Sequence, residues 1–350
     1  MRTSTNLDIL RSTAVLAVFA AHVAHCLFGK GFAGLVFFEA IGRFGVVLFF
    51  LHTSLVLMMS MDRTASEPAF VARFYVRRAF RIYPLSILAV ATVFVLHLPP
   101  DAWSRLHYFP IGALQLISNL LLIQNVTQTP PVLGVLWSLP LEVQMYAVLP
   151  FLFFMIRSGN WRVRLLLSLV AAVVSAGIVW KFTGKLNIFA FIPCFLAGVM
   201  AYKRLDRKPA LPAWIWVALI PGLIISIAAL PFYQKNFLLP VTLPLEWAVV
   251  WMLGFIWPLF REVTWKPMVH AGELIAKYSY GIYLAHTFAL YICFVLYKNS
   301  PTINVLLATI ITMVLSVSAY HLVEKPFIAV GKRVAKHIGR KSEPRSGLIV

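Results

Sequence analysis

The sequence predicts an all-α polytopic membrane protein with about ten transmembrane helices, one re-entrant or interfacial segment and both termini in the cytoplasm. The first observation is hydrophobicity: 61% of the 350 residues are hydrophobic, and the mean hydropathy is +0.84. Soluble domains have roughly 45–50% apolar residues and disordered chains have fewer, so both classes are excluded. The second is that apolar residues form runs of about 20, the length that crosses a bilayer. The third is the distribution of 31 Lys and Arg residues against 12 Asp and Glu residues.

Eleven apolar runs follow one another along the chain. They cover residues 9–28, 35–60, 82–98, 111–124, 138–156, 165–180, 187–202, 212–232, 241–260, 278–297 and 302–323. The first run is too long for a signal-peptide core and no small-residue cleavage site follows it, so we expect a transmembrane helix there. The fourth run is short, contains several amide side chains and leads into the breaker-rich stretch 127–134. We therefore expect it to be re-entrant or interfacial.

Basic residues support this count. With ten spans and a cytoplasmic N-terminus, 24 of the 31 Lys and Arg residues fall on the cytoplasmic side, as the positive-inside rule requires. If all eleven runs crossed the membrane, the basic loop at 157–164 and every later cluster would lie outside. The cations form no continuous stripe, so no nucleic-acid partner is predicted. We expect a multi-pass protein of the inner (cytoplasmic) cell membrane, with one membrane domain over 1–330 and a basic, flexible cytoplasmic tail over 331–350.

The three cysteines lie far apart, each within an apolar run. Cys26, Cys194 and Cys293 therefore show neither a disulfide framework nor zinc-ligand spacing, and we expect small buried side chains and no metal site.

Ionisable side chains at membrane depth are costly, which makes each a candidate for function. They are His22, His25, Glu39, Arg43, His52, Glu142, Glu246 and His286. In the first run, Asp8, Arg11, His22 and His25 form one polar stripe, with Arg11 and His22 within about 20° of the same helix face. His22 lies about 16 Å beyond Arg11, roughly midway through a bilayer core of about 30 Å. The alternative is that His22 only bonds to a neighbouring helix.

Two further segments contain candidate functional residues. Glu142 stands in the first turn of an expected helix, at the end on the outer side of the membrane. It suits general acid–base catalysis there. The alternative is that the carboxylate is placed there only because the positive end of the helix dipole stabilises it. Arg77, Arg78 and Arg81 lie at the cytoplasmic mouth of the third helix, with Arg77 and Arg81 on a shared face. Guanidinium groups match phosphates bidentately, so the cluster predicts a phosphate clamp; the alternative is a topology signal or lipid-headgroup contact.

Taken in order, these segments resemble the acyltransferase family 3 integral-membrane acyltransferases. The resemblance covers most of the chain and rests on LDILR at 7–11 followed by His22, GVVLFF at 45–50, the basic segment 77–84, LWSL at 136–139 with Glu142 and Tyr146, SYGIYLAH at 279–286 and VEKP at 323–326. One departure is His52, which stands where the family often has Phe-Phe-x-x-Ser-Gly. The chain also ends about 25 residues past its last apolar run, so we expect no appended hydrolase-like domain.

The resemblance implies transfer of an acetyl or other short acyl group from acyl-coenzyme A to a hydroxyl of a saccharide or other acceptor, with no bound cofactor. It assigns catalysis to Arg11, His22 and Glu142, with His22 as the expected general base. It assigns the donor to Arg77, Arg78 and Arg81. Further residues expected to line the site are Asp8, His25, His52, Tyr146, Tyr283 and His286.

Other functions compete with this one. Buried His and Glu residues in ten helices also suit a proton-coupled transporter of a small solute or glycan intermediate, although no two related halves are visible. A glycosyltransferase would need an acidic pair in a loop, and none is found. The acceptor and the acyl group are left open.

Overall fold

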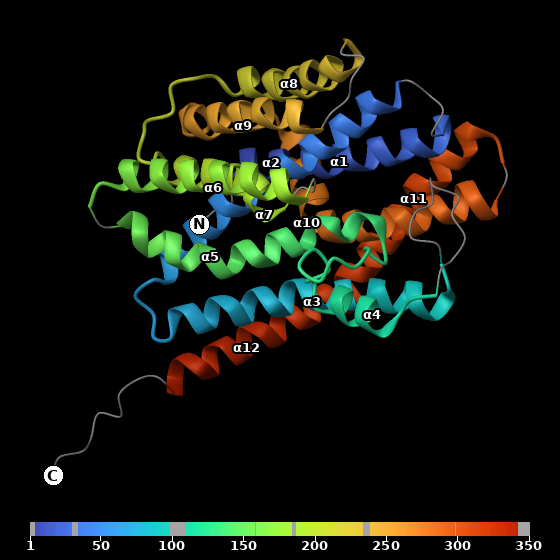
Figure 1. Cartoon of the computed structure of the whole chain (residues 1–350), viewed down its shortest axis with the longest axis horizontal. Helices are drawn as coiled ribbons and strands as arrows, with labels where there is room; N and C mark the ends of the chain where they lie inside the picture. Colours follow the sequence, from blue (N-terminus) through green and yellow to red (C-terminus); the bar gives the residue numbers. More distant parts are fainter. Residues whose placement is uncertain are drawn as a thin grey trace.

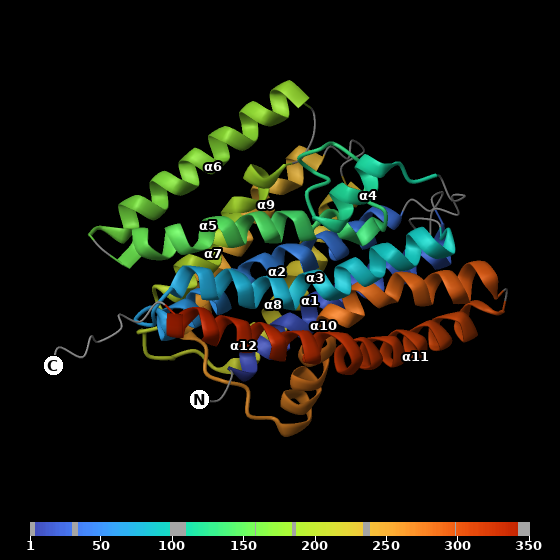
Figure 2. The same ribbon diagram turned by 90° about the horizontal axis from the view of Figure 1, so that it is seen from below.

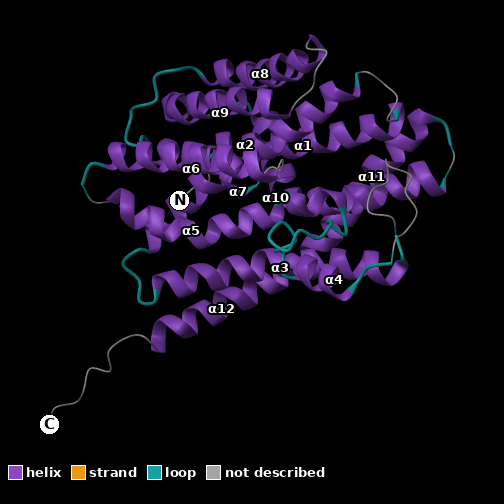
Figure 3. Ribbon diagram, in the orientation of Figure 1, coloured by secondary structure: helices purple, strands orange, loops and turns teal. Residues whose placement is uncertain are grey.

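The computed structural model describes residues 4–29, 34–98, 110–157, 159–183, 187–233, 239–297 and 299–341. Over these ranges the protein is helical (Figure 3), and one isolated bridge joins Leu211 to Phe260. The helices are α1 (Thr5–Phe28), α2 (Leu35–Thr64), α3 (Phe70–Leu96), α4 (Ala113–Leu120), α5 (Leu139–Arg157), α6 (Trp161–Thr183), α7 (Ile188–Tyr202), α8 (Ala213–Tyr233), α9 (Leu239–Ile256), α10 (Lys266–Tyr291), α11 (Pro301–Ala319) and α12 (Lys325–Lys341). The all-α prediction is confirmed.

Seven helical segments in the described part of the chain are long and apolar enough to cross a membrane. Three shorter apolar segments, Ile188–Tyr202, Ala213–Ala229 and Leu243–Leu259, bring the set to the ten runs that the sequence predicted as spans. That all ten cross, with both termini in the cytoplasm, stays a prediction. Most of the helices run roughly along the long axis of the molecule (Figure 1), and the view from below shows α6 at its edge (Figure 2).

The basic helix ends meet at one end of the bundle. The Glu262 carboxylate, between α9 and α10, accepts hydrogen bonds from Ser4 Oγ (2.7 Å) and Thr5 Oγ1 (2.6 Å) at the start of α1. Asp62, near the end of α2, lies 4.0 Å from Arg157 at the end of α5.

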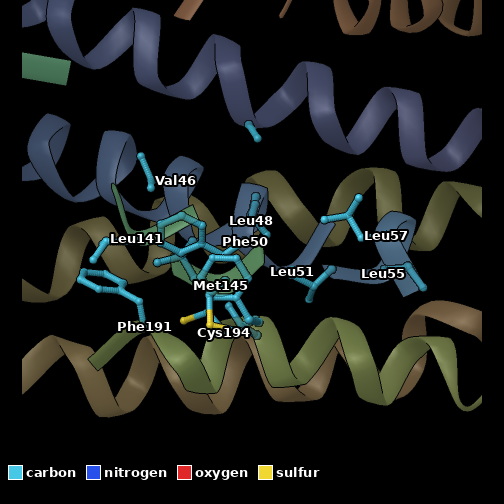
Figure 4. Packing of buried hydrophobic residues seen from close by; sticks show 14 of the residues in the cluster. Val46, Leu48, Phe50, Leu51, Leu55, Leu57, Leu141, Met145, Phe191 and Cys194 are labelled. Carbon is cyan, nitrogen blue, oxygen red and sulfur yellow. The ribbon is translucent and has the colours of Figure 1, made fainter. Parts of the chain in front are cut away.

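The packing core is built around α2. Figure 4 shows side chains from α2 meeting those of α5 and α7, including Phe50, Met145 and Phe191. Gly198 of α7 permits the close approach, because a Cβ there would collide with the Ser54 hydroxyl and a backbone carbonyl of α2. Cys194 is buried in the same contact, as expected.

The predicted re-entrant segment contains only a short helix. At eight residues, α4 extends about 12 Å and is too short to cross a bilayer. Buried Asn119 holds the turns that follow: its Oδ1 accepts from Val132 N (2.8 Å) and its Nδ2 donates to Pro130 O (3.0 Å). Glu142 lies in the first turn of α5 and lines cavities between α1, α2, α3 and α5. Its expected position on the outer side of the membrane stays a prediction.

The structure also differs from the expected flexible tail after residue 330. Helix α12 continues to Lys341 and packs along α3. Two glycines permit this contact: a Cβ on Gly331 would lie 2.6 Å from Phe80 Cβ, and one on Gly339 would lie 2.9 Å from an Arg73 nitrogen. Residues 342–350 of the predicted tail lie outside the described residues.

Candidate active site

A polar chamber lies between α1, α2, α3, α5 and α10. It consists of two adjoining cavities of about 340 Å³ and about 60 Å³. Both are lined by Arg11, Thr53, Arg81, Glu142 and Tyr146. The larger cavity reaches the start of α1 and the end of α2, and so approaches the basic end of the bundle. A chamber of this kind can hold a charged ligand within otherwise apolar helices.

Glu142 projects into the chamber from the first turn of α5. Tyr146, one turn further along the helix, donates its hydroxyl proton to Glu142 Oε1, and Thr53 Oγ1 of α2 lies 3.4 Å from the same oxygen. Arg11 and Arg81 line the same cavities from α1 and α3. The sequence placed no cation near Glu142, and the fold supplies Arg11 and Arg81 among others from different helices.

Arg11 is fixed by helix α10. Its Nε donates to Ser279 Oγ (2.6 Å), and Ser279 in turn donates to the carbonyl of Ala276 (2.8 Å). Since Nε is used in this bond, the two Nη groups are the donors that Arg11 offers to a ligand.

The three predicted donor-binding arginines do not share one environment. Arg78 and Arg81, three residues apart, line the chamber, whereas Arg77 does not. Arg77 lies on the neighbouring face of α3, close to Arg73, which forms an ion pair with Glu67 (2.6 Å). The chamber therefore contains an i, i+3 pair, Arg78 and Arg81, in place of the expected i, i+4 pair.

Two of the expected lining residues also reach the larger cavity. His52 of α2 is 5% exposed and lines it together with Asp8 of α1. The histidine that departs from the family pattern thus lies at the chamber, and the polar stripe of α1 begins there.

Three of the predicted site histidines, His22, His25 and His286, lie in a second cluster outside the cavities of the chamber. His22 Nδ1 lies 2.7 Å from His286 Nε2, and the rings are nearly parallel, with an interplanar angle of 10°. His25 Nε2 lies 3.5 Å from Glu39. By helix rise, His22 is about 16 Å from Arg11 along α1. The structure therefore divides the predicted site into an arginine–glutamate chamber and a histidine pair.

Tyr283 lies between the chamber and the histidine pair. It lines the chamber, donates its hydroxyl proton to Val135 O (2.6 Å) and is bonded to Ser138 Oγ (2.7 Å). Its ring centroid is 6.3 Å from that of His286, one turn further along α10. Tyr283 thus ties the chain just before and at the start of α5 to α10, the helix that carries His286.

Sequence reasoning missed Thr53, Ser138 and Ser279 as polar lining residues. Ser138 and Ser279 stood inside the quoted motifs, each four residues before a named site residue, which was a usable signal. Thr53 gave none. Among the described residues, no group of three or more His, Cys, Asp or Glu side chains is placed to hold a metal ion.

Comparisons with known proteins add a family match. The sequence profile of the acyltransferase 3 family, described as an acyltransferase domain, matches residues 4–321. The chain is 28% identical over 313 residues to the exopolysaccharide production protein ExoZ of Rhizobium meliloti (strain 1021), across 83% of this chain and 91% of that protein. No solved structure matches the chain. The matched region contains both the chamber and the histidine pair.

Proposed function

Because the chain belongs to the acyltransferase 3 family, we propose that it moves an acetyl or other short acyl group from acyl-coenzyme A to a saccharide hydroxyl. It does so as a multi-pass protein of the inner membrane, with both termini in the cytoplasm. The observation that carries the proposal is the chamber of Arg11, Arg78, Arg81 and Glu142 inside a bundle of apolar helices. Charged groups at such depth are retained where they handle a polar substrate.

The proposal that the acceptor is a saccharide rests on the similarity to ExoZ. ExoZ is named for exopolysaccharide production, and the alignment covers nearly the whole of that protein. A saccharide presents many hydroxyl groups of similar reactivity, which suits a transferase that activates one of them. Product analysis by mass spectrometry identifies both the acceptor and the acyl group.

The donor is assigned to the arginine side of the chamber. Acyl-coenzyme A is cytosolic and carries several phosphates, and the larger cavity approaches the basic end of the bundle. Arg78 and Arg81 supply guanidinium groups for phosphate oxygens, with Arg11 deeper on α1. The flexible pantetheine arm then extends past Tyr283 and presents the thioester beyond the chamber.

Proton transfer is assigned to His22. An acceptor hydroxyl is a weak nucleophile until a base removes its proton, and imidazole is the usual base near neutral pH. The hydroxyl oxygen attacks the thioester carbonyl carbon, its proton passes to His22, the C–S bond breaks and the departing thiolate recovers the proton. Glu142, bonded to Tyr146, orients donor or acceptor groups at the inner side of this path.

Labelled acyl-coenzyme A added to membranes that contain the protein tests this function. We expect label to appear covalently in a saccharide fraction, and His22→Ala to reduce that transfer by about 10²–10⁴-fold. Uptake of a solute without any covalent product would instead identify a transporter. Undiminished transfer by His22→Ala would remove His22 from the mechanism while leaving the transferase assignment in place.

A further inference from the structure

The contact between His22 and His286 fixes which ring nitrogens carry protons. His22 Nδ1 and His286 Nε2 are 2.7 Å apart, although the two residues are 264 positions apart in the sequence. At this distance one nitrogen must donate and the other must accept. The rings are nearly parallel and their centroids are 5.0 Å apart, a separation that together with the short distance between the nitrogens fits two imidazoles meeting at their edges.

The other nitrogen of His286 decides the assignment. His286 Nδ1 lies 2.9 Å from the carbonyl oxygen of Ile282, which can only accept, so Nδ1 carries a hydrogen. His286 is 1% exposed, and the rings of Phe19 and Tyr283 pack around it. A charged imidazole in these surroundings would be costly, so His286 is neutral and its Nε2 is the acceptor.

It follows that His22 carries its hydrogen on Nδ1. In the neutral imidazole the lone pair is then on Nε2, which is the nitrogen able to remove a proton. The opposite tautomer would place a hydrogen on Nε2 and present a donor where a base is needed.

We propose that His286 is a positioning residue that holds His22 in the tautomer and ring orientation required of a base. The inference rests on the proposed function, in which His22 removes the acceptor proton. When Nε2 takes that proton, the Nδ1–H bond to His286 persists and stabilises the charged ring. When the thiolate leaves, Nε2 returns the proton to it, so the pair ends in its starting state.

Three substitutions of His286 separate this role from simple packing. In His286→Gln the side-chain oxygen reaches the position of Nε2 and accepts the His22 hydrogen. In His286→Asn the shorter amide reaches the position of Nδ1 and loses that contact, and His286→Leu removes both polar atoms. We expect His286→Gln to retain activity within about tenfold, and the other two to lose about 10²-fold or more in kcat, with donor KM unchanged.

His270 supplies the matched control. It is exposed near the start of the same helix, outside the chamber and the histidine pair. His270→Gln, His270→Asn and His270→Leu should leave kcat and KM unchanged. Donor KM and elution from a size-exclusion column in detergent report folding of each variant.

The outcomes separate a failure of the positioning role of His286 from a failure of the proposed acyl-transfer function. Full activity in His286→Leu or His286→Asn would overturn the positioning role, as would equal loss in the Gln and Asn variants with normal donor KM. If His22→Ala abolishes transfer while the His286 variants stay active, the proposed base stands and the pairing does not. If the wild type transfers no acyl group, the proposed function itself fails.

Discussion

Two groups of charged side chains are buried among the apolar helices, and they differ in what surrounds them. Arg43 of α2 and Glu246 of α9 form an ion pair, with Arg43 Nε 2.8 Å from Glu246 Oε1, and Glu246 is 0% exposed. Neither residue lines the chamber. Arg81 and Glu142 do line it, and the hydrogen bonds described for Glu142 Oε1 come from neutral hydroxyls.

The comparison shows that membrane depth alone does not identify a functional charge. By sequence, Arg43 and Glu246 were candidates on the same grounds as Glu142. The fold joins Arg43 to Glu246 across two helices, so each side chain is held by an oppositely charged partner. Charges in the chamber instead face a volume that a ligand can occupy. Substitutions should therefore affect stability in the first group and catalysis in the second.

The largest effect is expected at Glu142. Glu142→Gln keeps the size of the side chain and the bond from Tyr146, but removes the carboxylate charge from the chamber. We expect acyl transfer to fall by about 10²–10⁴-fold, in the range of lost acid–base or charge stabilisation, with little change in thermal stability. Rates in membranes and unfolding midpoints in detergent measure the two quantities. A stability loss as large as that of the ion-pair variants below would place Glu142 in the structural group.

The ion pair should show the opposite pattern. Glu246→Leu removes the buried carboxylate that pairs with the Arg43 guanidinium, and we expect a loss of about 3–5 kcal/mol in unfolding free energy. The double substitution Arg43→Leu with Glu246→Leu removes both charges and should recover most of that loss, because two apolar side chains suit the helix contact.

Thermal unfolding in detergent tests the recovery, and acyl transfer per folded molecule should stay near wild type in the double variant. If the double variant folds but transfers no acyl group, the pair belongs with the chamber and the contrast between the two groups is wrong.

A smaller effect separates two adjacent arginines. Arg78→Ala removes a guanidinium from the chamber, and loss of one charged hydrogen bond of about 1.5–3 kcal/mol corresponds to a rise in donor KM of about 10–150-fold. Arg77→Ala, outside the chamber, should change donor KM less than about twofold. Steady-state kinetics with varied acyl-coenzyme A measures both. Equal effects would mean that the phosphates lie at the mouth of α3 and not in the chamber.

The helices could be predicted from the sequence because hydrophobic runs are a local property. The run at 111–124 was set apart from the expected spans by its polar content, and the helix found there, α4, is only eight residues long. The rotation of α3 about its own axis could not be predicted, since it depends on α5 and α12, and so Arg77 was preferred to Arg78 as the partner of Arg81. Contacts between distant helices, such as Arg11 with Ser279, leave no periodic signal in one sequence. The contact of Glu142 with cavities lined by α1, α2 and α3 depends on how the chain before α5 folds, which no local pattern records.

The smallest expected effect concerns that segment. Asn119 is 0% exposed and bonds to both Val132 and Pro130, so it holds the turns that lead to the start of α5. Asn119→Ala leaves a buried backbone N–H without its acceptor, at a cost of about 1–3 kcal/mol. Because Glu142 follows this segment, we expect transfer to fall severalfold with a lower unfolding midpoint. Asn119→Asp, which sets a carboxylate oxygen against the carbonyls that the amide nitrogen contacts, should lose at least as much of both. A variant that loses stability but keeps the wild-type rate would show that the position of Glu142 is set by α2 and α3 and not by the re-entrant segment.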